Sequence, residues 1–276
     1  MLEVILDKEF IEVFDLRTRE WKILNRIFFN ENNIFIICKE LLTYIENNLT
    51  EENFQKWLDI FQELHDNKNT KVSTIDTLDS DAIYDEMAKN TDNYFFIIRN
   101  SNLLNSSKDY IYYLKDLSKN NLLLKDILES NKVVFRNSEF SSQKELESFF
   151  YKMYNCSKSN NLLIVSRYNK FDNFLLDPLK SKFKNTMYWT TQKNDHCVTN
   201  DYAFMRSKLS SRLKIYVGDS RTIHERIIVI GNMMISFDDD FDKIKMNLDA
   251  WQCVCTINSK IILEYLKKKN KLFPLS

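Results

Sequence analysis

The sequence predicts an α/β protein built from two α/β domains, residues 1–137 and residues 138–276. In both parts short apolar runs alternate with stretches that have helical apolar spacing. The net charge is zero, but residues 1–137 hold 24 Asp and Glu against 17 Lys and Arg, whereas residues 138–276 hold 15 against 22. A polar stretch, 137–143, lies between the two parts. An acidic half followed by a basic half indicates two units with different electrostatic roles.

The first half is predicted to form a mainly parallel sheet covered by helices, because strands and helices alternate along it. The expected strands are 4–6, 33–38, 72–75 and 94–98, with 133–135 as a last strand. The expected helices are 39–48, 51–65 and 80–89. Thr50 is a favourable N-cap for the second of these helices, which has acidic residues in its first turn.

The second half follows the same logic. The expected helices are 142–154, 171–183, 202–213 and 260–269. The expected strands are 161–165, 187–189, 213–217, 226–230, 233–237 and 251–257. Gly231-Asn232 separates two of these apolar runs, which predicts a hairpin.

Composition excludes several classes of protein. Only two of the 276 residues are glycine, where average usage would give roughly 19. Glycine-rich phosphate loops therefore cannot be assembled, which excludes P-loop NTPases, kinases and Rossmann dehydrogenases. No apolar run is long enough for a membrane span and no signal pattern is present, so we expect a cytoplasmic protein.

The five cysteines form no CxxC pair. Cys253 and Cys255 are two residues apart in an apolar run, so a strand would place both on one face. We expect buried free thiols. A zinc site is the alternative, and it would need histidines brought in by the fold.

Acidic residues gather where the first half predicts strand ends and helix starts. Asp7 follows the first strand, Glu40 begins the helix after the second, and Asp79, Asp81 and Asp85 surround the start of the third helix. Ends of neighbouring parallel strands lie at one edge of a sheet. Convergent carboxylates would suit Mg²⁺ or Mn²⁺ and phosphodiester hydrolysis. The alternative is that these acids cap helices.

This order of acidic residues resembles the PIN-domain nucleases over about the first 130 residues. The resemblance implies a metal-dependent nuclease whose metal ligands are Asp7, Glu40 and Asp81, with Asp85 as a further catalytic candidate. The family usually places a fourth acid after the next strand. Here Asn100 or Asn102 stands in its place, and an amide is a weaker ligand.

The most distinctive segment of the second half is 220–230, which contains Ile223-His-Glu-Arg226. On a strand His224 and Arg226 would share one face and Glu225 would point to the other. An imidazole beside a guanidinium is a suitable phosphate-binding pair. The alternative is that Arg226 forms an ion pair with an acid such as Asp219 or Asp240.

This segment resembles the phospholipase D-like fold, whose signature is His-x-Lys, over residues 140–276. It is most similar to variants with Ile-His-Asp-Arg, found in membrane-trafficking and bacterial effector-associated proteins. Lysine is replaced by Arg226, and only one His motif is present, which favours phosphate binding over catalysis. Basic and aromatic residues around it would suit a nucleic-acid groove, or else a solvated surface. They are Lys180, Lys182, Lys184, Arg206, Lys208, Arg212, Lys214, Tyr168, Tyr188, Trp189 and Tyr216.

Together these patterns predict a metal-dependent nuclease joined to a phosphate-binding accessory domain. Its substrate would be RNA or DNA, its cofactor Mg²⁺ or Mn²⁺, and its setting prokaryotic antiviral defence or a toxin effector. A protein partner or a homo-oligomer fits this setting. One alternative is a non-catalytic regulator built from degenerate nuclease folds. Another is catalysis at His224, with the first half binding a partner.

Overall fold

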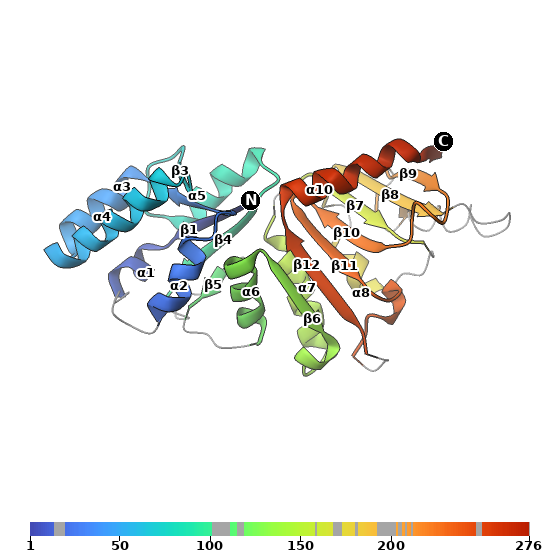
Figure 1. Cartoon of the computed structure of the whole chain (residues 1–276), viewed down its shortest axis with the longest axis horizontal. Coiled ribbons are helices and arrows are strands. Elements are labelled where there is room, and N and C mark those ends of the chain that lie inside the picture. The colour runs from blue at the N-terminus through green and yellow to red at the C-terminus, as the bar shows by residue number, and fades with distance from the viewer. Residues whose placement is uncertain are drawn as a thin grey trace. The chain divides into compact units, whose positions relative to one another are not determined.

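The computed structural model divides into two compact units, Met1–Asn131 and Lys132–Ser276 (Figure 1). It describes the chain except for residues 14–19, 101–110, 115–118, 158, 168–172, 180–181, 192–202, 204–205, 208, 211, 247–249 and 276. Each unit has its own sheet, so each is described by itself.

The first unit is built on a sheet with the strand order β3-β2-β1-β4-β5. Its strands are β1 (Leu2–Leu6), β2 (Asn33–Ile37), β3 (Thr70–Val72), β4 (Tyr94–Arg99) and β5 (Ile111–Tyr113). All of these pairings are parallel, and Val4 in β1 lies between Phe35 and Phe96. β1 and β4 are buried along their whole length, as expected of central strands covered on both faces.

Helices cover both faces of this sheet. They are α1 (Lys8–Val13), α2 (Glu20–Phe28), α3 (Lys39–Asn48), α4 (Glu51–Asp66), α5 (Ser80–Met87) with the short 3₁₀ helix η1 (Ala88–Asn90), and α6 (Lys119–Ser130). On one face Trp57 of α4 makes edge-on ring contacts with Phe10 and Phe28. On the other face Tyr84 of α5 meets Phe95 of β4 edge-on, with ring centroids 5.4 Å apart.

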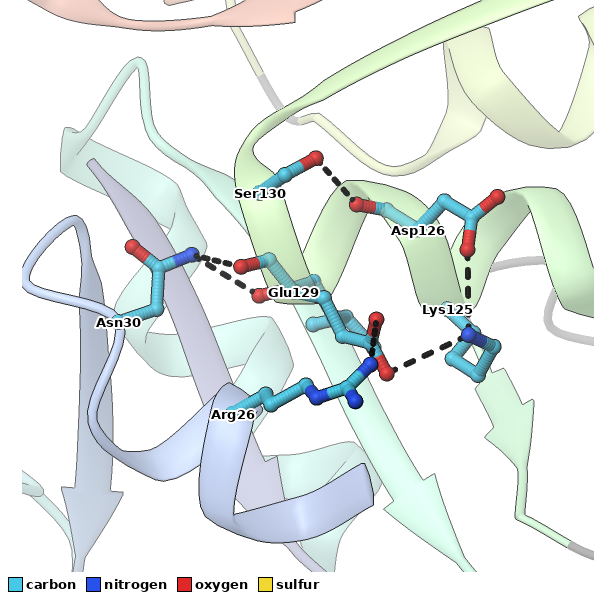
Figure 2. A network of polar contacts seen from close by, with 7 residues as sticks. Arg26, Asn30, Lys125, Asp126, Glu129 and Ser130 are labelled. Carbon is cyan, nitrogen blue, oxygen red and sulfur yellow. Dashed lines mark hydrogen bonds and ion pairs between the residues drawn. The ribbon is translucent and has the colours of Figure 1, made fainter. Parts of the chain in front are cut away.

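A polar network fixes α6 against the turn between α2 and β2 (Figure 2). The Asn30 side chain donates to the carbonyl oxygens of Leu128 and Glu129, both at 3.1 Å. The carboxylate of Glu129 forms two ion pairs, with its Oε2 3.7 Å from Nη1 of Arg26 and its Oε1 3.3 Å from Nζ of Lys125. The two hydrogen bonds from Asn30 satisfy carbonyl groups that the last turn of a helix leaves without partners.

The second unit is built on a mixed sheet with the order β13-β9-β8-β7-β10-β11-β12-β6. Its strands are β6 (Lys132–Arg136), β7 (Asn161–Val165), β8 (Asn185–Thr191), β9 (Lys214–Gly218), β10 (Arg226–Ile230), β11 (Met233–Phe237), β12 (Gln252–Ile257) and β13 (Phe273–Leu275). β7, β8 and β9 pair in parallel, whereas β10 joins β7 antiparallel. β10 and β11 form a hairpin through Gly231, whose φ of 55° suits glycine.

Helices also cover both faces of this second sheet. They are α7 (Gln143–Asn155), α8 (Asn173–Leu176) and α10 (Ser259–Leu266), with 3₁₀ helices η2 (Asn137–Glu139), η3 (Asp177–Leu179), η4 (Phe241–Lys243) and η5 (Lys267–Lys271). Phe150 of α7 packs against Phe135 and Phe237 on one face. Ile262 of α10 packs against Ile227 and Val229 on the other.

The structure confirms the α/β class, with a parallel sheet in one unit and a mixed sheet in the other. It corrects the strand expected at 133–135. β6 does not extend the first sheet; it pairs antiparallel with β12 in the second unit. The reason is packing, because Phe135 makes edge-on ring contacts with Phe149 and Trp251. Within the described residues, no helix is long and apolar enough to cross a membrane.

Candidate functional site

The first candidate site lies where the strand order of the first sheet reverses. The chain passes from β1 outward to β2 and β3, and then returns to place β4 on the other side of β1. In open α/β sheets ligands bind at such a reversal, beyond the carboxyl ends of the strands. Asp7 follows β1 and Arg99 ends β4, so both residues stand at this point.

Asp7 is buried and fully engaged by its neighbours. The residue as a whole is 5% exposed. The Ser80 hydroxyl donates to Oδ2 at 2.8 Å, and the backbone N–H of Glu9 donates to Oδ1 at 3.0 Å. Nε of Arg99 lies 3.2 Å from Oδ2. Each oxygen of Asp7 therefore already has a donor or a cation against it.

Arg99 links Asp7 to a second carboxylate. Its Nη2 lies 3.7 Å from Oδ1 of Asp81, and its side chain is only 8% exposed. Asp79 accepts from the backbone N–H groups of Asp81 and Ala82, and so caps α5. The capping interpretation is therefore confirmed for Asp79, whereas Asp81 faces a guanidinium.

The remaining acidic candidates are exposed. Glu40 and Asp85 are exposed, in the first turn of α3 and on α5. The backbone N–H of Glu40 donates to Oδ1 of Asp76 at 2.6 Å. Asn100 is buried next to Arg99, and its Oδ1 has no partner among the described residues. Asn102 lies outside the described residues.

The structure does not bring the three predicted metal ligands together. In the part of the chain that the structure describes, no three His, Cys, Asp or Glu side chains form a group that could hold a metal ion. Asp7, Glu40 and Asp81 are therefore not brought together as a metal-binding set. Arg99 lies within ion-pair distance of both Asp7 and Asp81.

Sequence reasoning missed Glu9, which belongs to the same cluster. Burial and the nearby charge of Asp7 raise the pKa of Glu9, while Arg99 acts in the opposite direction. Its Oε2 is buried and has no hydrogen-bond partner among the residues that the structure describes. The spacing Asp7-x-Glu9 at the end of a strand was the available signal.

A small pocket beside Asp7 is lined mainly by apolar side chains of β1, β2 and α5. Cys38 is the N-cap of α3; its thiol donates to the carbonyl oxygen of Thr77 at 3.2 Å and accepts from the N–H of Leu41 at 3.3 Å. Burial raises the pKa of Cys38. This thiol is therefore a structural cap rather than a nucleophile.

The second candidate site lies where the second sheet reverses its strand order, between β7 and β10. His224 is exposed, two residues before β10 begins at Arg226. Nε of Arg226 donates to Oδ1 of Asp240 at 2.5 Å. Asp240 is only 6% exposed. The ion pair of Arg226 with Asp240 is thus confirmed, and His224 lies two residues before Arg226, on a loop rather than on the strand.

Glu225 connects this loop to η5, the 3₁₀ helix that directly follows α10. Its Oε2 accepts from the backbone N–H of His224 at 3.2 Å, and its Oε1 accepts from Nζ of Lys268 at 2.5 Å. Burial opposes ionisation of Glu225, but the hydrogen bonds from Lys268 and from the backbone lower its pKa overall. Lys268 also lies 4.6 Å from the ring centroid of Tyr265. The backbone at His224 is therefore held in place.

Only some of the residues expected to line a nucleic-acid groove are exposed in the part of the chain that the structure describes. Tyr188 and Trp189 are buried in the core, with 0% and 1% exposure, so they cannot stack with bases. Lys182 donates to the carbonyl oxygen of Tyr154 and to the Asn155 side chain, and thus caps α7. Among the basic residues expected in this groove, four are described and exposed: Lys184, Arg206, Arg212 and Lys214. Lys180, Lys208 and Tyr168 lie outside the described residues.

The cysteines are free and buried at every described position, which confirms the expectation for Cys253 and Cys255. Cys197 lies outside the described residues. Burial raises the pKa of both Cys253 and Cys255 above the ordinary value of 9.0. These thiols therefore belong to the core and are unreactive in the native state.

The raised thiol pKa values predict a pH dependence of stability. Above about pH 9 the unfolded chain loses thiol protons that the folded chain retains, so the free energy of unfolding falls as pH rises. Urea unfolding at pH 7.5, 8.5 and 9.5 measures this slope. Replacing Cys255 with Ala removes one of the groups and should flatten it. An identical slope in both proteins would contradict the assignment.

No family model matches the chain, and no curated protein matches it. Several solved structures are similar. A phospholipase D family member, Nuc from Salmonella typhimurium, is 12% identical with a TM-score of 0.40, covering 52% of this chain and 97% of its own. NucT from Helicobacter pylori is 10% identical with a TM-score of 0.39, covering 52% and 98%. TrmBL2, an archaeal chromatin protein with a novel mode of DNA binding, is 12% identical with a TM-score of 0.33, covering 82% and 70%.

Proposed function

We propose that this protein acts on the phosphodiester backbone of a nucleic acid through His224, without a divalent ion in its first unit. The observation that carries the proposal is the exposed side chain of His224, two residues before Arg226, whose guanidinium is fixed by Asp240, at the reversal point of the second sheet. An imidazole can attack phosphorus or transfer a proton near neutral pH, and a guanidinium can bind phosphate oxygens.

The neighbours of His224 support a binding role for this edge. Glu225 holds the backbone at His224 and is itself held by Lys268. Asp240 fixes the orientation of Arg226 through Nε. Backbone and cation are therefore positioned before a ligand arrives, which lowers the entropy lost on binding.

As in the nuclease predicted from the sequence, the proposed substrate is RNA or DNA, but the proposed activity does not use Mg²⁺ or Mn²⁺. Among the described residues of the first unit, no three acidic, histidine or cysteine side chains form a group that could hold a metal ion. We therefore expect cleavage through His224 to be unaffected by EDTA.

A non-catalytic role is the second candidate, and a specific observation favours it. Asp240 already neutralises Arg226, and Arg99 already neutralises Asp7. Both ion pairs reduce the reactivity of the groups involved. In this alternative the protein binds nucleic acid, or a protein partner, without cleaving it.

Replacing His224 with Ala tests the proposal. We expect it to abolish cleavage of labelled RNA or DNA, while unfolding changes by less than about 0.5 kcal/mol because the side chain is exposed. Cleavage and binding are measured with and without EDTA. His65 is the matched control, since it is an exposed histidine on α4 and His65→Ala should leave both readouts unchanged.

Three outcomes separate the candidates. Cleavage that survives EDTA and is lost in His224→Ala supports action through His224. Binding without cleavage, weakened in His224→Ala, supports the non-catalytic role. Cleavage that is abolished by EDTA and unaffected by His224→Ala overturns both.

A further inference from the structure

We propose that Arg99 is a built-in cation that takes the place of a divalent ion between Asp7 and Asp81. The inference concerns the first unit and does not depend on the function proposed for His224. Its starting point is position, because both Asp7 and Arg99 stand where β1 and β4 end, at the reversal point of the parallel sheet. This is the edge at which a ligand of such a sheet is expected.

The geometry shows what a metal ion would have to displace. Oδ2 of Asp7 faces both the Ser80 hydroxyl at 2.8 Å and Nε of Arg99 at 3.2 Å. Its Oδ1 accepts from the N–H of Glu9 at 3.0 Å. Oδ1 of Asp81 lies 3.7 Å from Nη2 of Arg99. One guanidinium thus reaches both carboxylates.

Charge and burial explain why the guanidinium is retained. The side chains of Asp7 and Arg99 are each 8% exposed, and that of Asp81 is 32% exposed. A buried carboxylate needs a positive partner, and arginine supplies one that stays protonated at all accessible pH values. Arg99 therefore neutralises the buried charge of Asp7 without recruiting an ion from solution.

Removing the guanidinium should open the site to a metal. Arg99→Gln removes the guanidinium that lies near both Asp7 and Asp81, and carboxylate oxygens suit Mn²⁺. We expect its affinity for Mn²⁺ to be about tenfold or more above that of the wild type. Binding is followed by the loss of the free-ion signal in electron paramagnetic resonance, and by thermal melting in EDTA and in Mn²⁺.

Two further variants control the experiment. Arg99→Lys keeps a cation at the position, so its melting temperature should not rise with Mn²⁺. The double variant Asp7→Asn with Arg99→Gln removes a carboxylate, and should lose the Mn²⁺ binding that Arg99→Gln gains. Both comparisons use the full chain and do not depend on cleavage.

The experiment still tests the inference if Arg99→Gln does not fold in EDTA. Wild-type protein that binds Mn²⁺ and loses this binding in Asp7→Asn overturns the inference directly. Arg99→Gln that folds and binds Mn²⁺ no better than the wild type overturns it as well. Wild-type protein without Mn²⁺ binding, together with a variant that gains it or that folds only when Mn²⁺ is added, supports it.

Discussion

Arg226→Ala is expected to lower the free energy of unfolding by about 3–5 kcal/mol. The reason is that Asp240, which is 6% exposed, loses the cation that lies 2.5 Å from its Oδ1. A buried carboxylate without a partner is costly, and the folded state bears this cost. Chemical unfolding of the variant and the wild type in the same buffer measures the difference.

The control for this experiment is Arg221→Ala, because Arg221 is an exposed arginine of the same unit. We expect it to change the free energy of unfolding by less than about 0.5 kcal/mol. Adding Asp240→Ala to Arg226→Ala should recover part of the loss, since the unpaired charge is then removed. Wild-type stability in Arg226→Ala, together with weakened nucleic-acid binding, would show that Arg226 serves ligands rather than architecture.

Asp7→Asn is expected to have an effect of similar size, about 3–5 kcal/mol in the free energy of unfolding. The substitution keeps the size of the side chain but removes the charge that pairs with Arg99, whose side chain is 8% exposed. Arg99 would then be a buried cation that has lost its nearer ion-pair partner and retains the more distant Asp81. Thermal and urea unfolding monitored by circular dichroism measure the loss.

The matched control is Asp59→Asn, since Asp59 is an exposed acid on α4 whose side chain accepts from Gln55, one turn away. We expect less than about 0.5 kcal/mol for it. A role for Asp7 as a metal ligand predicts the opposite pattern, with an intact fold and lost cleavage. Asp7→Asn with wild-type stability would therefore contradict the structural role that the ion pair with Arg99 indicates.

Local patterns allowed several elements to be predicted closely. α3 spans the expected residues, Lys39–Asn48, and α4 begins after the expected cap, Thr50, which accepts from the N–H of Asn53. β7 and the hairpin of β10 and β11 also agree with the apolar runs. Helical spacing, caps and short apolar runs are properties of a few adjacent residues, so they can be found without knowing the fold.

The short helices α1 and α2 were not predicted. α1 has six residues and lies directly after β1, so too few turns are present for a periodic pattern. Within the described part of the helix expected at 171–183, the α-helix α8 covers Asn173–Leu176 and the 3₁₀ helix η3 follows it at Asp177–Leu179. Periodicity is least informative for segments of this length.

By itself, the sequence determined the α/β class, the buried thiols and the two segments that hold the candidate sites, around Asp7 and His224. Only the tertiary structure decided which partners those residues have. Arg99 lies 92 positions after Asp7, and Asp240 lies 14 positions after Arg226. Pairing across such separations depends on strand order and burial, which set the charge each carboxylate meets. The same long-range packing buries Trp189 and places β6 in the second sheet. Removing apolar side chains from water is favourable, and more apolar surface is buried where both faces of a sheet are covered.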